Sequence, residues 1–440
     1  MSRSLHHESK GSGRLLASSQ AWRLRAERLI PGCAQTFSKG PTSFVQGVTP
    51  SFVSKAQGAC FWDVDGNRYL DYIMGLGPVI LGHADPMVNE AVRRQMELGM
   101  SFSLPHPIEV EVAELLNQII PCAERVRFGK NGSDATAGAV RVARAWTKRD
   151  KVACCGYHGW QDWFIGSTNR HFGVPHAVRQ LTLPFPYNDL QALHKLFREH
   201  KDQIACVIME PVAFDPPLPA FLEGVKELCD KNGALLVFDE IITGFRLALG
   251  GAQEYFGVQP DLACFGKAMA NGFPLSAIVG RADVLNLFED VFFSFTFAGE
   301  AVSLAACQAT IEVLHQRRGI PHLWRVGKCL QDGTNELIRE LGLQDTLACV
   351  GLPPLTGFRF LCRDQRQNVL LRSLLQQEAV KRSILTHGNH VLSLAHDDGI
   401  IEETLQAYGQ LLELVADTLR RGDLESCLEG PPIEPVLRQA

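Results

Sequence analysis

The sequence predicts an α/β fold built on a mostly parallel sheet that helices cover on both faces. Between about Asp85 and His315, short apolar runs alternate with stretches of helical periodicity. Each run is too short for a helix and lacks polar alternation, as is typical of strands buried on both faces. Strands that alternate with helices form sheets of this kind. The expected strands are RVRFG (125–129), KVACC (151–155), IACVIM (204–209), ALLVF (234–238), LACFG (262–266) and SAIVG (276–280).

The segments on either side of this region predict a smaller α+β domain formed from the two ends of the chain. In the N-terminal segment, Asp65-Gly66 predicts a hairpin turn between two strand-like runs. In the C-terminal segment we expect strands at 357–362 and 390–395, then a helix from about Gly399. The expected division is residues 1–20, disordered; 21–84, an N-terminal segment; 85–315, the large domain; and 316–440, the C-terminal small domain.

The composition argues against a nucleic-acid or membrane partner. The 440 residues include 43 Lys and Arg against 48 Asp and Glu, a net charge of −5 without a basic excess. The longest nearly uncharged apolar stretch, 72–82, falls short of the about 20 residues of a membrane span. The 13 cysteines are scattered without a C-x-x-C pair, so we expect free thiols, no metal site and a cytoplasmic location. The first residues lack the apolar segment of a secretory signal, and their Ser and Arg content leaves a transit peptide open.

Residues that could form a ligand site come directly after several of the predicted strands. In open α/β sheets, ligands bind beyond the carboxyl ends of the strands, so the residues directly after each strand are the first candidates for a site. They are Gly132-Ser133, Tyr157-His158, Glu210, Asp239 and Lys267.

Three of these positions point to particular chemistry. Gly132-Ser133 opens a helix whose N-terminus can hold a phosphate, although an ordinary helix cap explains the pair as well. Asp239 ends a central strand and needs a positive or protonated partner. A cap, a salt bridge with Arg246 or a magnesium site are alternatives, but no acidic cluster completes a metal shell. Lys267 has no charged neighbour from 262 to 280, so burial would lower its pKa and favour a Schiff base; a lysine reaching into solvent is the alternative.

One ligand satisfies all three positions. It carries a phosphate for Gly132-Ser133, a basic ring nitrogen for Asp239 and an aldehyde for Lys267. Pyridoxal 5′-phosphate has all three groups, and an imine to Lys with an Asp at the pyridinium nitrogen is its usual arrangement. Tyr157 offers an aromatic ring for the face of the cofactor.

The stretch LLVFDEIITGFRLALGGAQEYFGVQPDLACFGKAMANGFPLSAIVG resembles the class III aminotransferases, which have the fold type I of pyridoxal-phosphate enzymes. Within that class the chain is most similar to glutamate-1-semialdehyde 2,1-aminomutases, over nearly its whole length. The resemblance implies that Lys267 binds the cofactor aldehyde and Asp239 its ring nitrogen. Ile241 and Tyr157 would flank the ring, with His158 and Glu210 nearby. Gly132 and Ser133 would bind the phosphate, and Thr296 would reach the phosphate of a second subunit, which implies a homodimer with shared active sites.

Departures from the aminomutase pattern concern the substrate. An arginine that the aminomutases use for the substrate carboxylate is matched by Lys39, and lysine cannot form the bidentate pair of an arginine. Trp160 and Trp163 stand where the aminomutases have small or polar residues, so we expect a wider, aromatic site, unless these rings only pack in the core. The favoured function is transfer of an amino group from a small-molecule donor to an aldehyde or ketone, with a sugar as one candidate acceptor. Glutamate-1-semialdehyde 2,1-aminomutase activity is the alternative.

Two functions of other classes fit less well. A catalytically silent relative would not need the lysine, the aspartate and the phosphate-binding pair together. A Rossmann oxidoreductase needs G-x-G-x-x-G after a strand, and Gly75, Gly77 and Gly82 do not form that motif.

Overall fold

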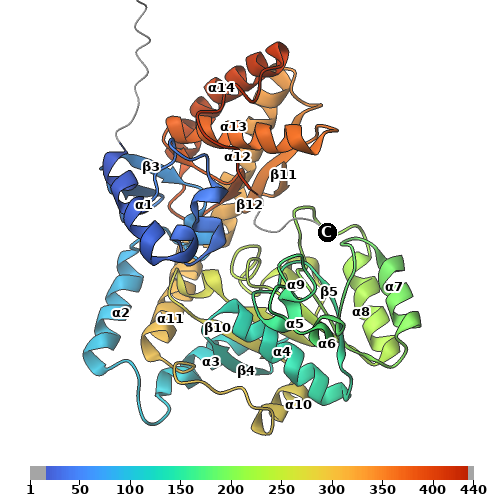
Figure 1. Cartoon of the computed structure of the whole chain (residues 1–440). Helices are drawn as coiled ribbons and strands as arrows, with labels where there is room; N and C mark the ends of the chain where they lie inside the picture. The colour runs from blue at the N-terminus through green and yellow to red at the C-terminus, as the bar shows by residue number, and fades with distance from the viewer. Residues whose placement is uncertain (1–15, 435–440) are drawn as a thin grey trace, which may run out of the picture.

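The computed structural model of the protein describes residues 16–434. Its centre is a seven-stranded sheet in the order β4-β10-β9-β8-β7-β5-β6 (Figure 1). Neighbouring strands from β9 to β6 run parallel, and β10 runs antiparallel to both β9 and β4. The strands are β4 (Arg125–Gly129), β5 (Lys151–Cys155), β6 (Thr182–Pro184), β7 (Ile204–Met209), β8 (Leu235–Asp239), β9 (Leu262–Phe265) and β10 (Ser276–Gly280).

The six predicted strands are confirmed to within one residue at each end. The pattern missed β6 because it has three residues, ends on a proline and lies at the sheet edge, where burial on both faces is not required.

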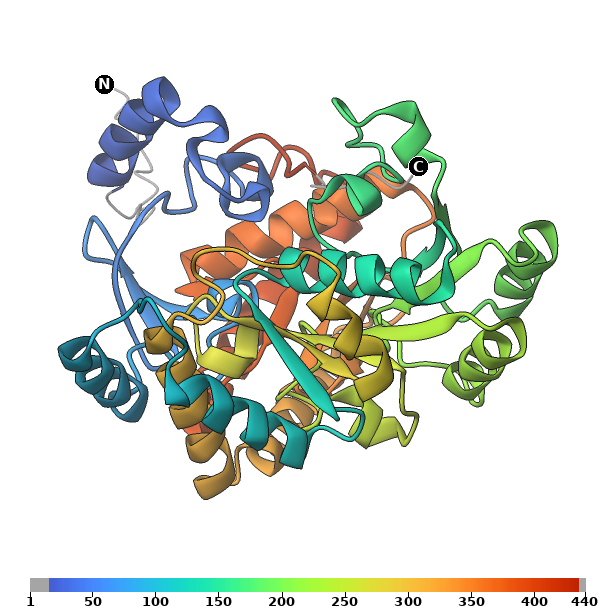
Figure 2. The ribbon, with the colours of Figure 1, turned by 90° about the horizontal axis from the view of Figure 1, so that it is seen from below.

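Both faces of the sheet are covered, which explains the uninterrupted apolar runs. Alternate strand residues, such as Cys206 and Ile208, pack against Ala135, Ala139 and Ala143 of α4 (Gly132–Thr147). The residues between them, such as Val207 and Met209, belong to the main core together with apolar residues of α3, α8 and α11. Figure 2 shows the sheet between these layers. The helices of this part are α2 (Pro86–Leu98), α3 (Pro107–Ile119), α5 (Asp162–Ile165), α6 (His176–Arg179), α7 (Leu190–Glu199), α8 (Phe221–Asn232), α9 (Ala252–Phe256), α10 (Ala282–Leu285) and α11 (Ala301–Gln316).

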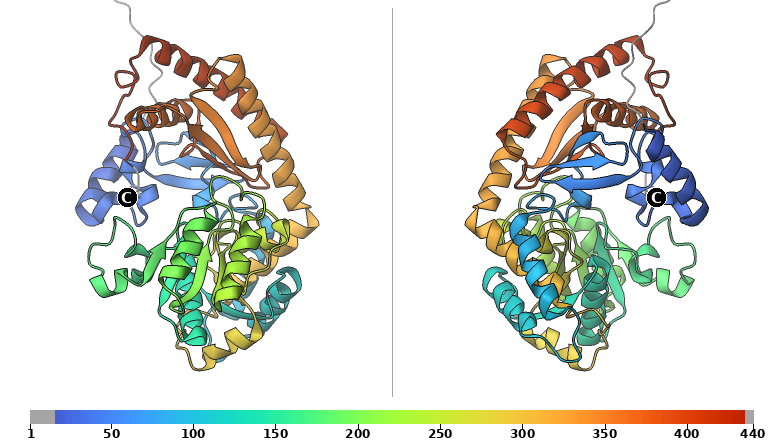
Figure 3. Two further views of the ribbon diagram at one scale, coloured as in Figure 1. Left: turned by 90° about the vertical axis from the view of Figure 1, so that its right-hand side faces the viewer. Right: turned by 90° about the vertical axis from the view of Figure 1, so that its left-hand side faces the viewer.

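The two ends of the chain pack together above the large sheet (Figure 3). The N-terminal sheet continues into the C-terminal part because β3 pairs in parallel with β13, giving the order β1-β2-β3-β13. A second small sheet has the order β11-β12-β14. The elements are α1 (Ala17–Leu29), β1 (Val53–Gln57), β2 (Cys60–Asp63), β3 (Arg68–Asp71), α12 (Gly319–Glu340), β11 (Leu347–Leu352), β12 (Leu355–Phe360), α13 (Gln365–Lys381), β13 (Ile384–Leu385), β14 (Asn389–Val391) and α14 (Asp398–Arg421).

The hairpin at Asp65-Gly66 and the final helix are confirmed, whereas three expectations need correction. Most of the predicted disordered segment lies outside the described residues, but α1 begins at Ala17. Its first turn is held because the Asp65 carboxylate accepts hydrogen bonds from the backbone N–H groups of Ser18 and Ser19, at 2.6 and 2.8 Å. The strand expected over 357–362 lies two residues earlier, at Leu355–Phe360, and the strand expected over 390–395 ends at Val391. The proposed domain boundaries stay a prediction.

The thirteen cysteines are all free thiols, most of them buried. Between residues 16 and 434, no helix has the length and apolar character needed to cross a bilayer. Over the same residues, no group of three His, Cys, Asp or Glu side chains is placed to hold a metal ion.

Candidate active site

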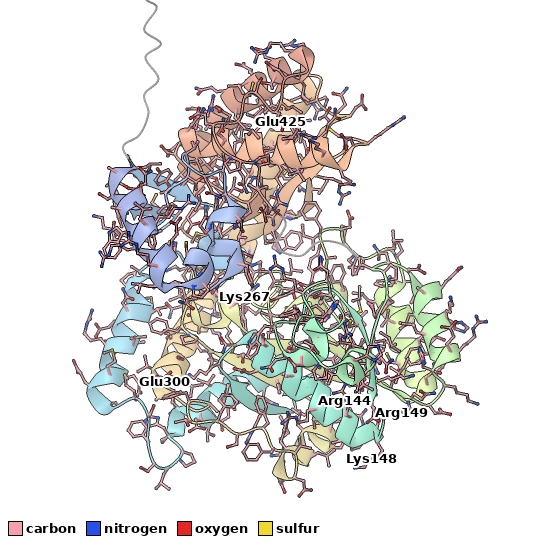
Figure 4. The ribbon with its side chains drawn as sticks, viewed as in Figure 1. Arg144, Lys148, Arg149, Lys267, Glu300 and Glu425 are labelled. Atoms are coloured by element: carbon pink, nitrogen blue, oxygen red, sulfur yellow. The ribbon has the colours of Figure 1, made fainter. Side chains whose placement is uncertain are left out.

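The carboxyl ends of the central strands open onto a cavity of about 1460 Å³. Lys267, Glu210, Tyr157 and Trp160 line it together with residues of both chain ends. Figure 4 shows Lys267 at the boundary between the large sheet and the N-terminal elements above it. The strand-end residues therefore meet where the smaller sheets close over the large one.

Lys267 begins the 3₁₀ helix Lys267–Ala270, directly after β9 and Gly266. Its φ of 44° lies in the left-handed region, which is rare for a residue with a side chain and is typical of strained functional positions. Burial lowers the pKa of the Lys267 amine and Arg246 adds to this, while Glu210 and Asp239 raise it. The net shift is downward, which increases the share of neutral, nucleophilic amine.

Asp239 ends β8 and is 3 % exposed. Its Oδ2 lies 2.8 Å from Nδ1 of His158, which is also buried. Nε2 of His158 lies 3.1 Å from the carbonyl oxygen of Cys155. A carbonyl oxygen and an ionised carboxylate can only accept, so the His158 ring donates from both nitrogens when Asp239 is ionised.

This geometry places His158 and removes one alternative for Asp239. His158 contacts the Asp239 carboxylate, so it can position that group, while its expected place at the cofactor stays a prediction. Arg246 does not pair with Asp239, because its guanidinium donates to the carbonyl oxygens of Leu392 and Gly77 at 2.7 and 2.8 Å.

The N-terminus of α4 forms a tightly shaped cradle. Gly132 is its first residue, and a Cβ there would lie 2.3 Å from Cδ1 of Ile241. A Cβ on Gly159 would lie 2.1 Å from Oγ of Ser133. The Ser133 Oγ accepts a hydrogen bond from the backbone N–H of Trp160 at 3.3 Å. Backbone packed this closely beside a helix N-terminus is suited to a phosphate, and the Ile241 side chain lies against the same backbone.

We predict that Gly159→Ala weakens cofactor binding. The new methyl group must displace Ser133, and the φ of +101° adds strain. Gly173→Ala is a matched control, because Gly173 also has a positive φ, +89°, but nothing lies within 4 Å of its Cβ position. We expect the Kd for pyridoxal phosphate, measured by fluorescence titration of apoprotein, to rise about tenfold or more for Gly159→Ala only. Equal affinities of the two variants would contradict this role of the cradle.

Glu210 and Tyr157 border the cavity beside Asp239. The Glu210 Oε2 accepts a hydrogen bond from the backbone N–H of Tyr157 at 2.9 Å. Burial, and then the nearby Asp239, raise the pKa of Glu210. Tyr157 is about half exposed, and its ring meets Phe164 edge to face with centroids 5.5 Å apart. Trp160, 65 % exposed, is the cavity-facing tryptophan of the predicted pair.

Three further predicted residues, Trp163, Lys39 and Thr296, do not line the large cavity. Trp163 is buried in the core cluster of α4 and stacks on His158, with centroids 6.1 Å apart, so its expected contact with substrate is not supported. Lys39 is exposed and lines a separate cavity of about 50 Å³, although Phe37 and Ser38 just before it line the large one. Thr296 is exposed in the loop before α11 and does not line the cavity.

Sequence reasoning missed the walls that the two chain ends contribute. Phe37 and Ser38 come from the N-terminal segment, His387 from the turn after β13 and Asn389 from the start of β14. Arg170 lies in the loop after α5, where no strand end marks it. The sequence signal that could have identified Arg170 is its place in a segment rich in aromatic residues.

Comparison with known proteins agrees with this site. The model of the family "Aminotransferase class-III" matches residues 43–346. A glutamate-1-semialdehyde 2,1-aminomutase of Syntrophobacter fumaroxidans is 40% identical over 76% of this chain and 78% of the relative. One of Roseiflexus castenholzii is 36% identical over 90% of this chain and 99% of the relative.

Solved structures show the same architecture. The FumI protein of Sphingopyxis sp. MTA144, solved in its pyridoxal-phosphate internal aldimine form, is 29% identical with a TM-score of 0.85, covering 94% of this chain and 98% of that one. A β-phenylalanine aminotransferase of Variovorax paradoxus is also 29% identical, with a TM-score of 0.80 and coverages of 90% and 94%. The chain belongs to the class III aminotransferases and is a pyridoxal-phosphate-dependent enzyme.

Proposed function

We propose that the enzyme moves an amino group between two molecules, from a small amino donor to an aldehyde or ketone that carries a bulky apolar part. The observation that supports this proposal is the cavity in front of Lys267. At about 1460 Å³ it exceeds the about 300–1000 Å³ usual for small-molecule sites, so it has room for cofactor and a large substrate.

When bound, pyridoxal phosphate supplies an electron sink for the carbon that bears the nitrogen. The residues of this chain bind the cofactor and hold or move the protons. Asp239, held by His158, is placed to keep a proton on the ring nitrogen. The Nζ of Lys267, with its lowered pKa, is placed to take a proton from the substrate carbon and return it. Gly132 and Ser133 would hold the phosphate end of the cofactor, and Tyr157 would border its ring.

The lining favours an apolar acceptor over the sugar that the sequence left open. It is formed largely by aromatic and aliphatic side chains, among them Phe37, Trp160, Phe172, Phe214 and Leu355. A sugar needs hydrogen-bond partners for each hydroxyl group, and such a surface offers few.

The second candidate is the intramolecular aminomutase reaction. It is favoured by relatives of 36–40% identity that carry that name. Two observations count against the aminomutase reaction. The cavity is large, and Lys39, which replaces the arginine of the aminomutases, does not line it.

A single-turnover assay separates the two candidates. We expect amino donors such as L-glutamate, L-alanine or 1-phenylethylamine to convert the visible band of the bound cofactor to its amino form, and a ketone to restore it. Glutamate 1-semialdehyde is the control substrate. Turnover of the semialdehyde to 5-aminolevulinate, without conversion by any other donor or acceptor, would favour the aminomutase.

We also propose that the enzyme is a homodimer with shared active sites, and that it works in the cytoplasm. Exposed apolar side chains gather on two neighbouring segments, the α2–α3 connection and the loop that holds Thr296. These segments touch, since the Ala301 N–H donates to the carbonyl oxygen of Met100 at 2.9 Å. A second copy of the chain would cover this surface, and Thr296 would then reach the cofactor phosphate bound to that second copy. The exposed residues are Leu98, Met100, Phe102, Leu104, Phe292, Phe295 and Phe297.

We predict that Leu104→Asp weakens this dimer. Leu104 is 79% exposed in the described chain, and a charge buried at an interface is costly. Leu218→Asp is the control, because Leu218 is also exposed, at 57%, but follows β7 elsewhere on the surface. Sedimentation velocity across a concentration series should show a monomer only for Leu104→Asp. A wild-type protein that sediments as a monomer at all concentrations would refute the dimer.

A further inference from the structure

Arg246 is a fully buried cation that does not line the cavity. Burial lowers its pKa to about 10, so the guanidinium stays charged at neutral pH. Among residues 16–434 it meets carbonyl oxygens and no carboxylate, and its Nε has no hydrogen-bond partner. Burying a charge without a balancing partner is costly, so we expect this cation to serve a function that a neutral side chain could not.

The guanidinium joins both ends of the chain to the large domain. Arg246 lies in the segment after β8, and it donates to the carbonyl oxygens of Gly77 and Leu392 at 2.8 and 2.7 Å. These acceptors lie on neighbouring segments, because the N–H of Val391 donates to the carbonyl oxygen of Tyr72 at 2.9 Å. The rigid fork of an arginine can hold two carbonyl groups at once, so Arg246 clamps the two segments to the strand edge below them.

The turn that Arg246 holds, residues 74–77, packs on the side chain of Lys267. A Cβ on Gly77 would lie 3.6 Å from Cδ of Lys267 and 2.6 Å from Cδ1 of Ile242, so the Gly77 backbone lies against both side chains. Figure 4 shows Lys267 directly below these N-terminal elements. The place of the turn therefore decides where the lysine side chain can rest.

This turn needs support from its surroundings. All four of its residues have a positive φ, between 46° and 102°. Such backbone is costly for residues other than glycine and persists only where neighbouring groups hold it. The Asp71 carboxylate holds the start of the turn, since it accepts from the N–H groups of Ile73 and Met74 at 2.9 and 2.8 Å. Arg246 holds its end, at the carbonyl group of Gly77.

We propose that Arg246 is the positioning residue of Lys267. By fixing the 74–77 turn it fixes the surface on which the lysine side chain rests, so the amine is set in place when both chain ends close over the sheet. This inference rests on the proposed role of Lys267 in amino transfer.

The charge of Arg246 supports the same assignment. Burial lowers the pKa of Lys267, the charged groups Glu210 and Asp239 raise it, and Arg246 lowers it again. The two carboxyl groups would favour the ammonium form of the lysine if no cation opposed them. A neutral donor could hold the turn, but only a cation also opposes these two groups, which explains why a charge is buried here.

Labelling of the apoprotein tests the inference without the cofactor. Pulses of formaldehyde and cyanoborohydride methylate neutral lysine amines, and peptide mass spectrometry gives the rate at each lysine against pH. Arg246→Met removes both the clamp and the charge, and an apolar side chain is well tolerated at a buried site. We expect the midpoint of Lys267 to rise by about one pH unit, which lowers its rate at neutral pH about tenfold. Lys226 in the same sample should keep its midpoint.

Arg149→Met is the matched control. Arg149 also donates to backbone carbonyl oxygens, those of Ile204 and Asn232 at 3.1 and 2.7 Å, but at the amino ends of the strands, away from the cavity. This variant should leave the midpoint of Lys267 unchanged. Arg246→Lys, which keeps one donor group on a long side chain, should recover part of the shift.

Gly77→Ala tests the turn with Arg246 in place. The new methyl group would overlap Cδ1 of Ile242, so the turn or the lysine must move. In the holoenzyme, Gly77→Ala and Arg246→Met should each slow the amino-transfer half-reaction about 10²-fold, the usual cost of a small misplacement. Gly422→Ala should match the wild type, because Gly422 has a positive φ, +74°, and nothing lies within 4 Å of its Cβ position.

Two results would overturn the role of Arg246. One is an unchanged midpoint of Lys267 in Arg246→Met, and the other is a half-reaction in that variant as fast as in Arg149→Met. If no donor converts the cofactor of the wild type, the proposed function fails, while the labelling midpoints still decide whether Arg246 acts on Lys267.

Discussion

Lys267→Ala is expected to lower the rate of the amino-transfer half-reaction by about 10⁴-fold or more. Proton transfer by a positioned side chain contributes about 10²- to 10⁴-fold, and the variant also loses the covalent link that orients the cofactor. The rate is measured from the visible band of the cofactor in a single turnover. In parallel, borohydride treatment and peptide mass spectrometry should place the reduced cofactor on Lys267 in the wild type and on no residue in the variant.

Lys226→Ala is the control for this experiment. Lys226, on α8, is partly buried and pairs with Asp230 of the same helix and with Asp261 directly before β9. Removing it therefore tests the loss of a lysine that does not line the cavity. It should keep both the labelling and the rate. A Lys267→Ala protein that still fixes the cofactor at another lysine would show that the assignment of Lys267 is wrong.

The lowered pKa of Lys267 gives the same experiment a pH dependence. Burial disfavours the ammonium form, so the neutral amine is present at a lower pH than for an exposed lysine of pKa 10.5. Covalent capture of pyridoxal phosphate by the apoprotein should accelerate as pH rises and level off below 10.5.

The grouping of the strand-end residues could be predicted from the sequence, because each lies at or directly after a strand. Asp239 and Lys267 come at or directly after apolar runs, and Glu210 follows another. Parallel strands end on the same edge of the sheet, so local pattern alone brought these residues to one place. In such a fold, the residues at the carboxyl edge of the buried sheet are therefore the easiest part of the site to predict from the sequence.

The walls of the cavity could not be predicted, because they depend on contacts between distant segments. His387 and Asn389 reach the cavity through the pairing of β13 with β3, which joins residues more than 300 positions apart. Trp160 and Trp163 differ by three positions in a short loop and helix, yet one faces the cavity and the other the core. No local periodicity distinguishes them, since α5 has only four residues.

Asp239→Asn is expected to lower the half-reaction rate by about 10³-fold. The substitution removes the negative charge that would keep the cofactor nitrogen protonated, and it leaves the buried His158 facing a neutral amide. A factor of about 10³ in rate corresponds to a loss of about 4 kcal/mol of transition-state stabilisation.

His158 gives this prediction its control and its mechanism. If His158 acts by holding Asp239 through the 2.8 Å contact, His158→Phe should lower the rate less than Asp239→Asn. It should also shift the pH dependence of the cofactor's visible band, which a purely structural role would leave in place. His158→Gln, which retains a donor toward the carboxylate, should recover part of both effects. A His158→Phe enzyme with the wild-type rate and pH profile would mean that Asp239 is fixed by its own strand and needs no partner.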